Sequence, residues 1–141
     1  MIAWEAAFPD LERLYRWLQP RSEAGSAACR ACGRCCRFSK MDHILYATAL
    51  EVAFFMSHHG MRPVPCTDVC PWQERNHCTA REGRPLGCRV YFCSGMTPAD
   101  EEALSTEAHA ELRAIHDRHA LPWHYAPFLQ LLAAPDMMRT R

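Results

Sequence analysis

Cysteines are the residues of this sequence best suited to chemistry, and all nine lie between Cys29 and Cys93. The number is odd, and the first twenty residues lack the basic start and the apolar stretch of an export signal. Clustered cysteines in a reducing compartment are more typical of metal ligands or redox centres than of disulfides. We therefore treat all of them as candidate metal ligands: Cys29, Cys32, Cys35, Cys36, Cys66, Cys70, Cys78, Cys88 and Cys93.

The first group of cysteines has the spacing CxxCxxCC, from Cys29 to Cys36. Two residues between cysteines allow a tight turn to direct both sulfurs at one centre. Three such cysteines in series resemble the ferredoxin-type run that supplies several ligands of an iron–sulfur cluster. Cys35 and Cys36 are adjacent, and adjacent side chains of an extended chain point to opposite sides. These two cysteines therefore suit either two centres or two sides of a larger cluster.

The second group contains no CxxC pair, whereas zinc ribbons usually show two such pairs far apart. This spacing favours an iron–sulfur cluster and leaves zinc as the alternative. Residues 29–93 carry nine basic and five acidic residues, so positive charge is in excess where the thiols are. Nearby cations favour the thiolate, which is the form that binds metal.

The order of these motifs resembles a known family. After CxxCxxCC come a cysteine before Pro71 and Trp72, a spaced cysteine, and the sequence Arg84-Pro85-Leu-Gly-Cys88-Arg. This pattern is similar to the zinc- or iron-chelating CxxCxxCC family of YkgJ-type cysteine-cluster proteins, and the similarity runs from Cys29 to Phe92. The resemblance implies metal chelation but no settled reaction. Its matching ligand positions are Cys29, Cys32, Cys35, Cys36, Cys70, Cys78 and Cys88, while Cys66 and Cys93 lie outside the pattern.

Three classes of function compete for this sequence. The first is a non-catalytic protein that holds an iron–sulfur cluster with a structural or redox role, or zinc with a structural role. The second is a subunit of a redox or methyl-transfer enzyme, since the related flagellin lysine methylases join such a domain to methyl transfer. The third is a thiol store or sensor. The chain shows no glycine-rich strand-to-helix loop for a nucleotide-like methyl donor, which favours a protein that is not an enzyme. We therefore assign no catalytic residue.

Charge and hydropathy restrict the partners and the location. Sixteen basic and sixteen acidic residues cancel, which argues against general binding to nucleic acid or to a membrane surface. No apolar run approaches the roughly 18 residues of a membrane span. We expect a cytoplasmic protein, and a protein partner remains open.

The elements around the cysteines predict a small single domain that is mainly α, with irregular loops stapled by metal. Its parts are an N-terminal helix and loop (1–28), a cysteine-cluster core (29–93) and a C-terminal helical segment (94–141). We expect helices over 9–19 (stopped by Pro20), from a Thr48–Glu51 capping box to Gly60, from Pro98 to Pro122, and over 126–133. Residues 38–47 suit a short extended segment, and 61–95 suit loops with one turn of helix.

Two further residue types have specific expectations. Arg84 precedes Cys88 in the Arg-Pro step, and we expect its guanidinium to be buried against a cluster sulfur, a backbone carbonyl or a carboxylate. The simpler alternative is a surface ion pair with Glu82 or Glu74. The histidines of the third helix lie near one face, but no carboxylate motif accompanies them, so we interpret them as surface or core residues: His109, His116 and His119. A Cys–His nucleophilic pair is not indicated, because no pattern places a thiol beside an imidazole.

Overall fold

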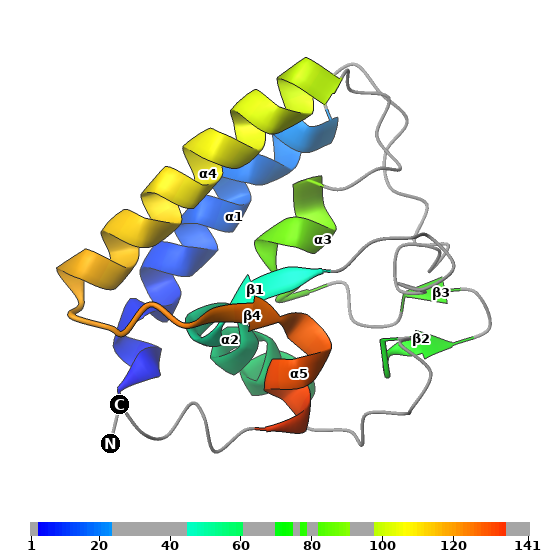
Figure 1. The fold of residues 1–141 in the computed structure, drawn as a ribbon, viewed down its shortest axis with the longest axis vertical. Coiled ribbons are helices and arrows are strands. Elements are labelled where there is room, and N and C mark those ends of the chain that lie inside the picture. Colours follow the sequence, from blue (N-terminus) through cyan, green and yellow to red (C-terminus); the bar gives the residue numbers. More distant parts are fainter. Residues whose placement is uncertain are drawn as a thin grey trace.

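The computed structural model of the protein describes residues 3–23, 45–60, 70–74, 77–78, 82–90 and 98–134. Within these residues the chain is mainly helical, which confirms the predicted class. A short 3₁₀ turn, η1 (Trp4–Ala7), leads into α1 (Phe8–Glu23), which runs alongside α4 (Pro98–Arg118) (Figure 1). The shorter helices α2 (Ala49–His59), α3 (Leu86–Val90) and α5 (Phe128–Ala133) lie to one side of this pair.

Helix α1 is longer than the sequence predicts, because it continues through Pro20 to Glu23. The expectation that Pro20 stops this helix is therefore wrong. A proline inside a helix removes the hydrogen bond to the carbonyl four residues earlier and crowds that carbonyl, but Pro20 lies in the last turn, where few further hydrogen bonds depend on it. The last turn has another donor, since Arg21 Nη1 donates to the Trp17 carbonyl oxygen at 2.6 Å.

Helices α1 and α4 pack against each other through one apolar face each. The buried face of α1 contains Leu11, Leu14, Tyr15 and Leu18. The buried face of α4 contains Leu104, Ala108, Leu112 and Ile115. Of the three histidines considered from the sequence, His116 is the one that is buried, at 1% exposure. His119 instead contacts Asp10 of α1 at 2.7 Å, and Arg118 contacts the same carboxylate at 2.8 Å, so both residues bridge the two helices.

A short antiparallel ladder joins two distant parts of the chain. Strand β1 (Tyr46–Thr48) pairs with β4 (Tyr125–Pro127), with Ala47 opposite Ala126. This pairing explains why α5 begins at Phe128 and not at the predicted residue 126. Of the extended segment expected at 38–47, residues up to 44 lie outside the described part. A second ladder joins β2 (Gln73–Glu74) to β3 (His77–Cys78), and together with α3 it gives residues 61–95 more regular structure than predicted.

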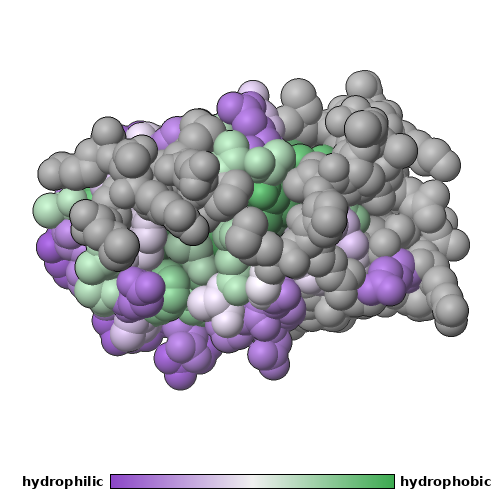
Figure 2. All heavy atoms as spheres, turned by 90° about the horizontal axis from the view of Figure 1, so that it is seen from below, coloured by the Kyte–Doolittle hydropathy of each residue, from purple (hydrophilic) through white to green (hydrophobic). Residues whose placement is uncertain are grey.

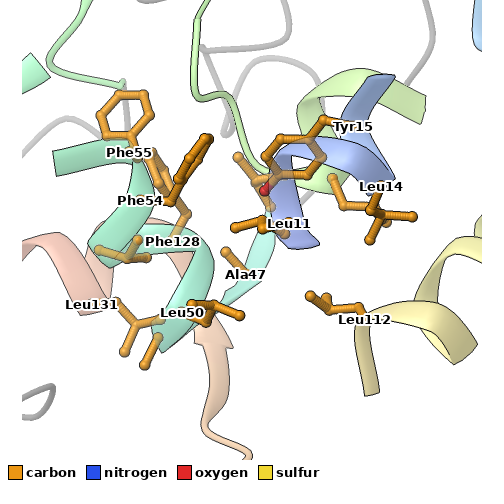
Figure 3. Close-up of a cluster of buried hydrophobic side chains, with 14 of the residues drawn as sticks. Leu11, Leu14, Tyr15, Ala47, Leu50, Phe54, Phe55, Leu112, Phe128 and Leu131 are labelled. Carbon is orange, nitrogen blue, oxygen red and sulfur yellow. The ribbon is translucent and has the colours of Figure 1, made fainter. Parts of the chain in front are cut away.

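Helix α2 lies at the centre of the core and begins and ends as predicted. The Thr48 hydroxyl accepts a hydrogen bond from the Glu51 backbone N–H at 3.2 Å, and Gly60 ends the helix with a φ of 73°. Phe55 of α2 meets the rings of Trp72 and Phe128 edge-on, with centroids 4.8 and 5.2 Å apart. Figure 3 shows this cluster, in which side chains of α1, α2, α4 and α5 converge around β1.

The surface of the described residues is mixed. On the face shown in Figure 2, hydrophobic residues reach the surface in the middle and hydrophilic residues lie along the rim. Two large apolar side chains in the described part are exposed, Tyr46 and Tyr125, and their rings stack on each other. No described helix has the length and apolar character needed to cross a membrane.

Candidate functional site

The described residues contain three of the nine candidate ligands. Cys70 is buried at 8% exposure beside the core, Cys88 is half-buried on α3, and Cys78 belongs to β3. The other candidates lie outside the described part of the chain: Cys29, Cys32, Cys35, Cys36, Cys66 and Cys93. Among the side chains that are described, no three from His, Cys, Asp and Glu gather as a metal site. Of these three cysteines, Cys88 is the one whose surroundings are described in most detail, through α3 and the residues that hold it.

Helix α3 lies unusually close to the segment before β1. A Cβ atom placed on Gly87 would overlap with Leu45 Cδ1, so only a glycine permits this approach as the side chains stand. The turn begins with Pro85, whose carbonyl oxygen accepts from the Cys88 N–H at 3.0 Å. Leu86 is buried at 2% exposure, and α3 also packs against α1 and α4. The backbone of Cys88 is thus fixed against the core.

Glu51 of α2 reaches the beginning of α3. Its Oε2 accepts a hydrogen bond from the Leu86 N–H at 3.4 Å, and the residue is only 1% exposed. Burial raises the pKa of the Glu51 carboxyl from 4.5 to about 8, against the opposing effects of the Leu86 and Thr48 hydrogen bonds and of Arg89. The carboxyl is therefore mostly protonated at neutral pH. The sequence identified Glu51 as part of a capping box but gave no sign of its contact with α3.

Arg89 follows Cys88 and ties α3 to α1. Its guanidinium lies over the ring of Tyr15 at 4.0 Å, and Nη1 donates to Gln19 Oε1 at 3.2 Å. Its Nε donates to the carbonyl oxygen of Arg84 at 2.7 Å, which closes the loop that contains Cys88. Burial lowers the pKa of Arg89, whereas the charges of Tyr15, Cys88 and Glu51 favour its protonated form. Arg89 therefore places a positive charge next to the thiol.

Tyr15 provides a buried hydroxyl at the same place. Burial raises its pKa well above the usual value of 10.0, and the charge of Glu51 acts in the same direction. The hydroxyl has no hydrogen-bond partner among the described residues. In Figure 3 it points away from α1 toward the side of Phe54. The sequence gave no sign of this buried polar atom.

The predicted burial of Arg84 is confirmed, since the residue is 7% exposed. Arg84 and Arg89 line a cavity of about 430 Å³ between α1, α2 and the segment before α3. Phe54 and His58 of α2 line the same cavity. Arg84 therefore does not lie on the exposed surface.

The histidines of α4 contact their own surroundings. His116 Nδ1 lies 3.1 Å from the Pro122 carbonyl oxygen and its ring meets Trp123 edge-on, while burial lowers its pKa below 6.5. His109 contacts the Tyr125 hydroxyl at 3.3 Å. These contacts agree with the interpretation of the helix histidines as core or surface residues.

Comparison with known proteins gives no relative for this chain. No family model, no curated protein and no solved structure matches it.

Proposed function

We propose that this protein is a cysteine-cluster protein that binds metal, and that it holds an iron–sulfur cluster in a structural or redox role. The observation that carries the proposal is the cysteine pattern, in which CxxCxxCC is followed by Cys70, Cys78 and Cys88 at the positions of the YkgJ-type motif. Three cysteines with two-residue spacings and a distant further ligand are the ligand pattern of iron–sulfur clusters.

The surroundings of Cys88 suit a thiolate ligand. The sulfur is half-buried, and the Arg89 charge next to it compensates the negative charge of a thiolate. Cys70 is buried beside an apolar core, and an apolar shell limits the access of water to sulfur ligands. Residues on both sides of Cys88 are held by other elements, so this ligand would be oriented before metal binds.

The proposed ligands would hold the cluster, and the cluster would supply electron transfer or crosslinking of the loops. The main ligands that we propose are Cys29, Cys32, Cys35, Cys70, Cys78 and Cys88. Cys36 would serve the same or a second centre. Cys66 and Cys93 are proposed as lesser contributors. Zinc in a structural site is the alternative metal.

Purification without oxygen, followed by a visible spectrum and by iron, sulfide and zinc analysis, tests this proposal. Brown protein that contains iron and sulfide is expected. Colourless protein with zinc would overturn the iron–sulfur assignment and retain metal binding, whereas protein without either metal would overturn both. Cys32→Ser should abolish most of the metal content, and Cys93→Ser is the matched control that should lose less.

Limited proteolysis separates a structural from a purely redox role. Metal bonds that close poorly structured loops stabilise the folded chain, so removal of the metal should expose more than one loop to protease. Equal resistance of the loaded and metal-free protein would exclude a structural role for the cluster.

A further inference from the structure

The helix that carries Cys88 is too short to hold its own position. Helix α3 has five residues, Leu86–Val90, and isolated helices of this length are not stable in water. The place of the Cys88 sulfur therefore depends on the contacts that α3 makes with its neighbours. Gly87 and Arg89 provide two of these contacts, toward Leu45 and toward α1.

The third contact comes from Glu51 at the start of α3. The first N–H groups of a helix have no partner within that helix, so the Leu86 N–H needs an acceptor from elsewhere. Leu86 is 2% exposed, and Glu51 Oε2 lies 3.4 Å from its nitrogen. A buried donor that loses its acceptor destabilises the arrangement that contains it. Glu51 thus holds the N–H two residues before Cys88.

From this geometry we propose that Glu51 is a positioning residue for Cys88. Glu51 holds the start of α3 and thereby fixes the position of the Cys88 sulfur. The role of Cys88 as a metal ligand rests on the proposed function, whereas its positioning by Glu51 does not. Among the described residues, Tyr15 from α1, Arg89 from α3 and Tyr125 from β4 interact electrostatically with Glu51. None of these three groups takes part in the hydrogen bond between Glu51 and Leu86, so all three remain in place in the Glu51 variants.

The test compares the reactivity of individual thiols in the protein as purified without oxygen. The rate of alkylation by iodoacetamide is measured separately for the peptides that contain Cys88 and Cys70, and their ratio is the result. Glu51→Leu removes the acceptor and should raise this ratio about tenfold, because the buried Leu86 N–H is left unpaired. Glu51→Gln keeps an acceptor oxygen at the same length and should stay within about twofold of the parent.

Two further variants separate positioning from general loss of stability. Val52→Ala removes buried volume from the same helix and keeps the Leu86 contact, so it should leave the ratio near that of the parent. Glu51→Asp keeps the carboxyl but shortens the side chain, so it should raise the ratio as Glu51→Leu does, and it also serves if the leucine variant does not fold. A ratio that rises equally in Val52→Ala and in the Glu51 variants would overturn the proposal.

Metal release distinguishes this proposal from the proposed function. In protein that contains metal, the rate of loss to a chelator should follow the same order, with Glu51→Leu and Glu51→Asp faster than Glu51→Gln. Parent protein without metal would overturn the proposed function, while the alkylation ratio would still decide the role of Glu51. An unchanged ratio in Glu51→Leu and Glu51→Asp would overturn the positioning role even in protein that contains a cluster.

Discussion

Replacement of Glu51 by glutamine should remove a large pH dependence from the stability of this protein. Burial raises the pKa of this carboxyl from 4.5 to about 8 in the folded chain. The folded chain therefore holds a proton that the unfolded chain releases between these two values. The stability that the protonated Glu51 carboxyl contributes to the folded chain is fully present below pH 4.5 and is lost as the pH rises through about 8. Within that window each pH unit lowers the free energy of unfolding by about 1.4 kcal/mol.

Urea unfolding followed by tryptophan fluorescence measures this effect in the parent and in Glu51→Gln. Between about pH 5.5 and pH 7.5 the free energy of unfolding of the variant, relative to the parent, should rise by about 3 kcal/mol. Other titrating groups are common to both proteins and cancel in the difference. Glu12→Gln is the matched control, because its side chain is 59% exposed, and its difference should stay within about 0.5 kcal/mol. A Glu51 difference that does not change with pH would refute the reasoning.

Three other substitutions test the surroundings of the site. Gly87→Ala brings a methyl group against Leu45 and should lower the free energy of unfolding by about 1–3 kcal/mol; equal urea midpoints would show that Leu45 moves aside without cost. Burial lowers the pKa of His116 below 6.5. The stability that the buried neutral imidazole contributes to the folded chain is therefore present above pH 6.5 and is lost on acidification. His116→Asn keeps a donor toward the Pro122 carbonyl and should lose less stability on acidification, as followed by thermal unfolding at pH 5 and pH 7; parallel curves would contradict this. Arg84→Lys should retain metal nearly as poorly as Arg84→Ala, because lysine keeps the charge but not the guanidinium fork. If the metal content of the lysine variant equals that of the parent, the charge alone is sufficient.

Local sequence signals predicted the helices well and the contacts between distant segments poorly. Thr48, Glu51 and Gly60 mark the beginning and end of α2 because capping depends on residues within one turn. Pro98 marks the start of α4 for the same reason. The pairing of β1 with β4 depends on three residues from each of two segments far apart in sequence, and no local pattern specifies it.

The candidate site shows the same division. The burial of Arg84 could be predicted because the Arg-Pro step belongs to a motif that includes Cys88. The contact between Glu51 and Leu86 could not be predicted, since it joins two helices and depends on how they pack. The first cysteine group, residues 29–36, lies outside the described part of the chain, so its ligand assignment stays a prediction.

The pairing of β1 with β4 also has a consequence for the order of events during synthesis. Every cysteine lies before residue 94, whereas the strand that pairs with Tyr46–Thr48 is Tyr125–Pro127. A ribosome therefore completes all nine thiols before it makes the residues that close the core beside α3. Chains fold during synthesis from the N-terminus onward, and long-range pairing must wait for its second strand. If the cysteines bind metal as proposed, the supply of metal during synthesis should therefore influence how much protein is loaded.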